Sequence, residues 1–293
     1  MIFNAAPIHY IECHGEEGLS IAMQVQAQIQ VTTATAEIDE RYRLSSLLDH
    51  GQEKQVYRGW DRREQQEVAI CRYPSKVRDS QACWQELQEL LALPRHRNVM
   101  QIHEILLFEE EIYMVCELFI KGDLSGIITR GIEWLAVLSL ASDLASGLDH
   151  IHGNGFLHRD VKPSNAFISE RGAVIGDFDM ACRAAVQVEL ECCRGTPAYM
   201  APEKIKGEED TESSDIYALG CTVYELATGA RVFSGNGTVS GSLRNHLHAE
   251  PARPSADAAV PAWFDQLVLA MLDKAPSNRP SAKAVAAELN DHA

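Results

Sequence analysis

The stretch HRDVKPSN, at positions 158–165, decides the fold of this 293-residue chain. It is followed by DFD at 177–179, which begins 12 residues after Asn165, and by GTPAYMAPE at 195–203. Three such stretches, in this order and at these spacings, are far more specific than any one of them alone. They give the chain a definite architecture to be tested against everything else in the sequence.

The three stretches match the pattern H-R-D-x-K-x-x-N, the D-F-G position and the end of the activation segment of eukaryotic-type Ser/Thr protein kinases. The chain resembles that family over about residues 41 to 290. The resemblance implies an α+β fold of two lobes: a small, mainly antiparallel β lobe with one helix over 41–118, and a larger, mainly α lobe over 119–293. It also implies ATP and Mg²⁺ (or Mn²⁺) as cofactors and a protein as substrate. Residues 1–40 lie outside it, as an N-terminal extension of unknown role.

Length and charge fit this interpretation and narrow the choice of partner. A chain of 293 residues is long enough for two lobes with a substantial core. The net charge of −16 argues against a nucleic-acid groove or an anionic membrane surface as partner. It favours basic protein substrates weakly; a simply acidic protein is the plainer interpretation. The sequence does not indicate an oligomeric state.

The eight cysteines show no spacing typical of a disulfide framework. We found neither a signal peptide nor an apolar run of 18 residues, so we expect free thiols, a cytoplasmic location and no membrane insertion of this chain. The absence of Lys and Arg from residues 1–40 argues against a secretory or mitochondrial leader.

Hydrophobic periodicity predicts the main elements. The alternation over 21–31 predicts a strand, with a disordered tail as the open alternative. Strands should then dominate up to Leu118, interrupted by one helix near 80–93. A long apolar-periodic helix is expected over 134–152, and a buried helix of the larger lobe over 215–228.

The resemblance assigns roles to five residues around the catalytic loop. Asp160 would accept the proton of the substrate hydroxyl, and Lys162 would contact the transferred phosphate. Thr196 would help to fix Asp160, and together with Lys162 it indicates Ser or Thr as the acceptor. Asn165 and Asp177 would bind the metal, because amide and carboxylate oxygens are the ligands that Mg²⁺ prefers.

The third strand departs from the family, since Cys71 stands where Val-Ala-Ile-Lys would place its lysine. Side chains at i and i+2 share one face of a strand. Lys54 therefore faces the cleft with Val56, on the same side as Ala69 and Cys71, whereas Arg72 points the other way. This arrangement is similar to the with-no-lysine kinases, which implies that Lys54 replaces the missing lysine. The alternative is an exposed lysine in a degraded glycine loop.

The rest of the nucleotide site follows from the same resemblance. Of the three loop glycines only Gly51 remains, and the partner acid of the lysine is expected at Glu86, or else at Glu89. Cys116 takes the gatekeeper position. The residues expected around the adenine are Val56, Ala69, Cys116, Glu117, Leu118 and Phe167.

The activation segment carries two further departures. Asp179 replaces the glycine of D-F-G and adds a carboxylate beside Asp177, which would recruit a second cation or repel phosphate when no metal is bound. From 177 to 195 there is no Ser, Thr or Tyr, so Arg159 has no phosphate to meet there. Either an acidic residue (Glu189 or Glu191) orders the segment, or the pair Cys192 and Cys193 controls it by redox; two plain free thiols are favoured over a redox switch.

The sequence leaves two alternatives to a Ser/Thr protein kinase. The poor glycine loop, Cys71 and Asp179 fit a pseudokinase that acts as a scaffold or allosteric binding module. A kinase-fold enzyme that transfers AMP is the other, although the complete catalytic-loop pattern argues against it.

Overall fold

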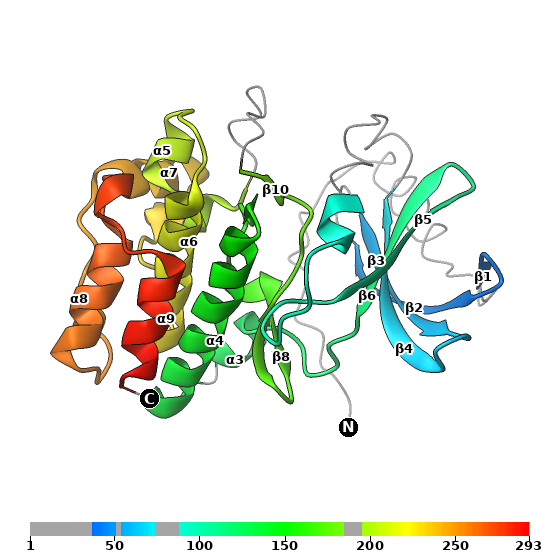
Figure 1. The fold of residues 1–293 in the computed structure, drawn as a ribbon. Helices are drawn as coiled ribbons and strands as arrows, with labels where there is room; N and C mark the ends of the chain where they lie inside the picture. The colour runs from blue at the N-terminus through cyan, green and yellow to red at the C-terminus, as the bar shows by residue number, and fades with distance from the viewer. Residues whose placement is uncertain (1–36, 51–53, 74–87, 130, 185–194, 293) are drawn as a thin grey trace, which may run out of the picture.

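The computed structural model describes residues 37–50, 54–73, 88–129, 131–184 and 195–292, and it has the two lobes expected of a protein kinase (Figure 1). The small lobe is one antiparallel sheet with strand order β1-β2-β3-β4-β6-β5. Its strands are β1 (Glu37–Ile38), β2 (Tyr42–His50), β3 (Gln55–Asp61), β4 (Gln66–Tyr73), β5 (Ile102–Phe108) and β6 (Glu111–Glu117). The strand predicted over 21–31 lies outside the described residues.

The two faces of this sheet separate the side chains as a period of two requires. On β4, Val68 and Ile70 are buried in a small cluster with residues of β1, β2 and β6. Cys71 and Tyr73 point to the other face and join the main core, which continues into the large lobe. Arg72 points away from the cleft, as the sequence predicted. On that face it pairs with Glu111 at 2.5 Å.

Of the predicted helix near 80–93, the structure describes residues 88–93, and the chain is helical over 88–91. The rest of it, including Glu86, lies outside the described residues. Leu90 is buried and, with Phe178, lines a hollow between the lobes.

The large lobe is mainly helical, as predicted (Figure 1). Its helices are α3 (Ser125–Ile128), α4 (Trp134–Gly153), α5 (Pro202–Ile205), α6 (Glu212–Thr228), α7 (Val239–His248), α8 (Ala262–Met271) and α9 (Ala282–Asn290). Two short antiparallel pairs, β7 (Phe156–Leu157) with β10 (Cys182–Arg183) and β8 (Ala166–Ser169) with β9 (Gly172–Ile175), frame the catalytic loop. No helix of the described part is both long and apolar enough to cross a bilayer.

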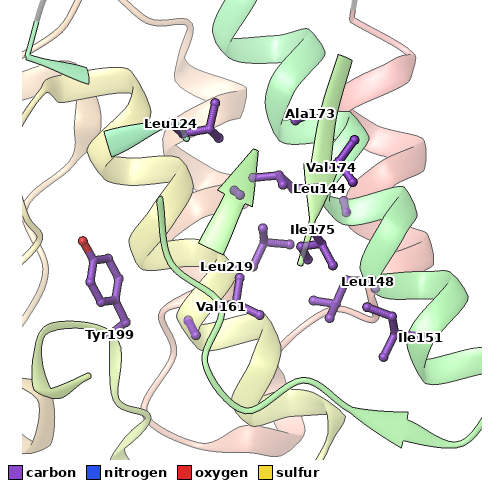
Figure 2. Close-up of a cluster of buried hydrophobic side chains, with 14 of the residues drawn as sticks. Leu124, Leu144, Leu148, Ile151, Val161, Ala173, Val174, Ile175, Tyr199 and Leu219 are labelled. Atoms are coloured by element: carbon purple, nitrogen blue, oxygen red, sulfur yellow. The ribbon is translucent and has the colours of Figure 1, made fainter. Parts of the chain in front are cut away.

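Helix α4 carries the core beneath the catalytic loop. Its buried residues recur at helical spacing and include Leu144, Leu148 and Ile151, which lie against Val174 and Ile175 of β9 (Figure 2). The helix begins at the predicted residue and ends one residue beyond the predicted end. Helix α6 begins three residues before its predicted start, because Thr211 and Ser214 form a capping box there.

A buried ion pair fixes the end of GTPAYMAPE to the rest of the large lobe. The two terminal guanidinium nitrogens of Arg279 donate to the Glu203 carboxylate at 2.6 and 2.8 Å. Ser214 donates a further hydrogen bond to the same carboxylate. Burial alone would raise the pKa of Glu203, but the hydrogen bonds from Arg279 hold it below its ordinary value.

Replacing Arg279 by Gln should therefore destabilise the protein strongly. The change leaves the Glu203 carboxylate buried without its cation, a situation that costs about 3–5 kcal/mol in comparable pairs. Urea denaturation followed by circular dichroism measures the loss. The matched control is Arg58→Gln, since the Arg58–Glu67 pair on the small lobe is 44% and 43% exposed. Equal midpoints for the two variants would contradict a structural role for the buried pair.

Candidate active site

The catalytic loop is held from below by one buried carboxylate. Asp215, on α6, accepts the backbone N–H of His158 at 2.8 Å and that of Arg159 at 2.7 Å, and His152 contacts it at 2.9 Å. These bonds stabilise Arg159 in the left-handed region, at φ 69°, which residues other than glycine rarely adopt. The anchor aims the next residue, Asp160, into the cleft.

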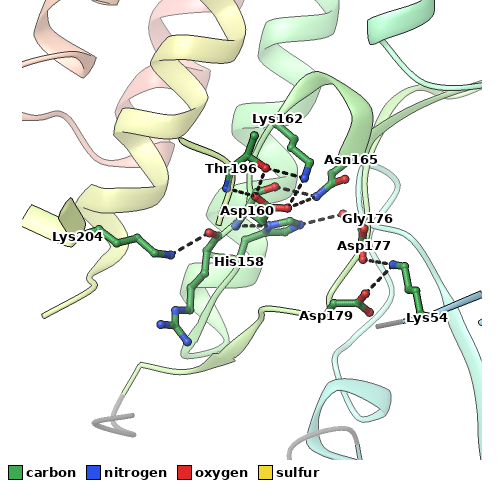
Figure 3. Close-up of polar contacts among 11 residues, drawn as sticks. Lys54, His158, Asp160, Lys162, Asn165, Gly176, Asp177, Asp179, Thr196 and Lys204 are labelled. Carbon is green, nitrogen blue, oxygen red and sulfur yellow. Dashed lines mark hydrogen bonds and ion pairs between the residues drawn. The ribbon is translucent and has the colours of Figure 1, made fainter. Parts of the chain in front are cut away.

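The Asp160 carboxylate lies at the centre of a hydrogen-bond network (Figure 3). It accepts from Lys162 at 2.6 Å, from the side-chain amide of Asn165 at 3.0 Å and from the Thr196 hydroxyl at 3.0 Å. Lys162 also donates to Thr196 at 2.8 Å. Burial opposes ionisation, but the hydrogen bond and charge of Lys162 hold the pKa of Asp160 below its ordinary value. The network therefore keeps the Asp160 carboxylate ionised.

Asn165 and Asp177, 12 positions apart, are the residues that the sequence predicted to bind a divalent cation. Asn165 uses its amide nitrogen on the Asp160 carbonyl and carboxylate, which turns its amide oxygen away from them. Asp177, also left-handed at φ 63°, presents its carboxylate to the cleft. Among the described residues there is no group of three or more His, Cys, Asp or Glu able to hold a metal alone. A pair of hard oxygen ligands fits Mg²⁺ that shares its other positions with phosphates and water.

Lys54 reaches the same place from the small lobe. Its ammonium lies 2.5 Å from Asp177 and 2.7 Å from Asp179, and the side chain is only 15% exposed (Figure 3). Burial alone would lower the pKa of Lys54, but the two carboxylates raise it, so the side chain stays charged. Val56 and Cys71 are direct cross-strand partners, as the cleft-facing register requires. The side chain of Lys54 therefore lies in the cleft, on the same side as Cys71, where the family pattern would place the lysine.

Asp179 joins this ion-pair cluster instead of standing apart as a second charge near the metal site. One of its oxygens pairs with Lys54, and the Tyr73 hydroxyl, from the end of β4, donates to the other. Burial and the neighbouring charge of Asp177 raise the pKa of Asp179. Three departures from the family pattern, at 54, 71 and 179, thus meet within one small volume.

The acid expected to accompany Lys54 is only partly accounted for. Glu86, the first choice, lies outside the described residues, as do Gly51, Glu189, Glu191 and the pair Cys192 and Cys193. Glu89, the second choice, is turned elsewhere, since its carboxylate pairs with Arg183 of β10 at 2.6 Å. Glu86 and Glu89 are three positions apart, about one helical turn, so both would lie on the same face of a helix. Sequence alone could therefore not decide between them.

Of the residues expected around the adenine, Val56, Ala69 and Cys116 lie on the neighbouring strands β3, β4 and β6. Ala69 and Cys116 are cross-strand partners, and Cys116 is almost fully buried. Contact with Cys71 and burial raise the pKa of the Cys116 thiol, so it stays protonated. Phe167, on β8, stacks on Phe119 with ring centroids 5.0 Å apart.

The link between the lobes follows directly after these strands. Glu117 ends β6 and makes two hydrogen bonds to Arg171, in the turn between β8 and β9, at 2.7 and 2.5 Å. Leu118 comes next and begins the crossing to α3. The Glu117–Arg171 contact ties this segment to the large lobe.

Three residues of the site were not singled out by any sequence pattern: Tyr73, Asp210 and Asp215. Tyr73 shares a strand face with Cys71, so its direction was predictable but its partner was not. Asp215 precedes an apolar run at the start of a buried helix, a signal for a buried carboxylate. Asp210 pairs with Arg159 at 2.8 Å. Nothing local to it indicates this, because the two residues are 51 positions apart.

Comparison with known proteins agrees with the two-lobed fold. The family model described as "Protein kinase domain" matches residues 42–289. The Ser/Thr-protein kinase PknL of Mycobacterium tuberculosis is 32% identical over 269 residues, which cover 87% of this chain and 66% of PknL. PknB of the same species is 30% identical over 263 residues (84% of this chain, 42% of PknB). PkaA of Streptomyces coelicolor is 33% identical over 200 residues (65% of this chain, 36% of PkaA).

The chain spans between about a third and two thirds of the length of these curated relatives. The match to the family model nevertheless covers both lobes, the catalytic loop and the activation segment. Together with the two-lobed fold, this shows that the chain belongs to the protein kinase family, with Ser/Thr kinases among its relatives.

Proposed function

We propose that this protein is a Ser/Thr protein kinase that transfers the γ-phosphate of ATP to protein hydroxyls, with Lys54 in place of the missing third-strand lysine. One observation carries the proposal: the Lys54 ammonium is ion-paired with Asp177 at 2.5 Å, at the edge of the intact network around Asp160. ATP would bind between the small lobe (41–118) and the large lobe (119–293).

The chain's own residues divide the work of the reaction. Asp160 orients the acceptor hydroxyl and takes its proton, since its carboxylate stays ionised. Lys162 bridges Asp160 and Thr196, where its charge faces the transferred phosphate. Lys54 would position the nucleotide phosphates, and the pair Asn165 and Asp177 would hold Mg²⁺ (or Mn²⁺). The bound metal supplies charge neutralisation of the phosphates.

The substrate and setting are inferred more broadly. Protein substrates follow from the family, and the net charge of −16 favours basic ones. A cytoplasmic location is supported by the free thiols of Cys71, Cys116 and Cys221 in the described part of the chain, since thiols persist in a reducing compartment.

The first test is transfer of labelled γ-phosphate from ATP with Mg²⁺ to the protein itself and to a generic basic Ser/Thr substrate. Asp160→Ala should lower the rate by about 10²–10⁴-fold, because the proton acceptor is lost. Label on Ser or Thr that disappears in this variant supports the proposal. No label from the folded parent at high concentration, with either Mg²⁺ or Mn²⁺, would overturn it.

The second test addresses the relocated lysine. Lys54→Ala should lower kcat/KM by about 10²–10³-fold, because a preorganised cation at the phosphates is removed. Cys71→Ala should change kcat/KM little, since the Cys71 side chain is buried and supplies no cation to the phosphates. Comparable activity of Lys54→Ala and the parent would exclude the relocated lysine and leave the rest of the proposal standing.

The alternative is a pseudokinase that acts as a scaffold or allosteric binding module. One observation favours it: Lys54 pairs with Asp177, the expected metal ligand, and Asp179 pairs with Lys54 in turn. A thermal-shift titration separates the two. A working kinase should show an increase in melting temperature with ATP that requires Mg²⁺, since a ligand stabilises the state that binds it. A flat response, with and without Mg²⁺, would favour the scaffold, and Asp177→Asn is the control for the metal requirement.

A further inference from the structure

Arg159 lies directly before Asp160, and its side chain is paired within the large lobe. The Nε of Arg159 is 2.8 Å from one carboxylate oxygen of Asp210. Both side chains are largely buried, at 13% and 12% exposed. Residues 177–195, the part of the activation segment before Thr196, contain no Ser, Thr or Tyr that could supply a phosphate to this arginine.

Asp210 joins Arg159 to a second cation. It lies in the loop between α5 and α6, and the same oxygen that meets Arg159 is 3.2 Å from the ammonium of Lys204, which is 7% exposed. Lys204 also donates to the Arg159 carbonyl at 3.1 Å. Two mostly buried cations therefore share one carboxylate, and without it they would repel each other.

This cluster controls the backbone that carries the catalytic aspartate. The N–H of Arg159 is bound by Asp215 and its carbonyl by Lys204, on either side of a left-handed residue at φ 69°. Such a conformation persists only where its surroundings enforce it. The cluster also lies beneath the end of the activation segment, since a Cβ added to Gly195 would be 3.7 Å from the Lys204 ammonium. The charge of Asp210 thus acts both on Arg159, directly before Asp160, and, through Lys204, on the end of the activation segment at Gly195.

We propose that Asp210 is a positioning residue that supplies, within the chain, the negative charge an activating phosphate would otherwise bring to Arg159. Phosphotransfer by this protein then needs no phosphate on the activation segment. The inference rests on the proposed function. It names one residue for the role and predicts that the loop glutamates Glu189 and Glu191 are not needed for it.

The test compares Asp210→Asn, which keeps the shape and removes the charge, with Asp210→Glu and with Glu209→Gln. Glu209 is the exposed neighbour and controls for the loss of one negative charge. Asp210→Asn should lower kcat by about 10- to 100-fold with little change in KM for ATP, as expected when a reacting group is misplaced but the nucleotide site is intact. Asp210→Glu should recover most of this loss, and Glu209→Gln should match the parent.

A second measurement keeps the inference open to refutation even if Asp210→Asn does not fold, which its melting curve would reveal. The parent is treated with a Ser/Thr and Tyr phosphatase, the phosphatase is removed, and the initial rate is measured on an external substrate. Activity should be unchanged. A loss of more than about tenfold, or an Asp210→Asn variant as active as the parent, overturns the role of Asp210 while the kinase proposal stands. A parent that transfers no phosphate at all defeats the proposed function itself.

Discussion

The arrangement of the whole site depends on the Asp215 carboxylate, which is buried under the catalytic loop and accepts two consecutive backbone N–H groups. A buried carboxylate needs such donors, because an unpartnered charge in the interior is very costly. Here the donors are those of His158 and Arg159, so satisfying the charge also fixes the turn of the chain. His158 carries the constraint onward, since its ring contacts the Gly176 carbonyl at 3.0 Å and packs beside Phe178. These contacts of His158 fix the position of the catalytic loop relative to the DFD segment.

The charges above this anchor form three local groups, each with its counter-charge in reach. Asp160 is met by Lys162, Arg159 by Asp210, and Lys54 by the pair of aspartates at 177 and 179. In this partly buried cleft each of these charged side chains is in contact with an opposite charge. A nucleotide and its metal would enter a site whose charges are already oriented, which is the condition for strong electrostatic stabilisation at low reorganisation cost.

The departures from the family pattern become intelligible when they are considered together. The loss of lysine at Cys71 leaves two thiols, Cys71 and Cys116, in contact at the back of the cleft. The ammonium of Lys54 enters the cleft from the neighbouring strand and meets Asp179, where a glycine would have offered no charge. Asp179 is in turn held by Tyr73 at the end of the strand that lost its lysine. The single ammonium of Lys54 thus lies between the carboxylates of Asp177 and Asp179.

The sequence by itself determined the family, the two lobes, the helices α4 and α6 in outline, and the direction in which Lys54, Val56 and Cys71 point. These depend on motifs and on strand parity, which are local properties. Only the tertiary structure decided the partners: Asp179 and Tyr73 for the lysine cluster, Asp210 for Arg159 and Asp215 for the loop. Lys54 and Asp177 are 123 positions apart, and Arg159 and Asp210 are 51. Which distant charges meet is fixed by how the lobes and loops pack, and no short-range pattern records that.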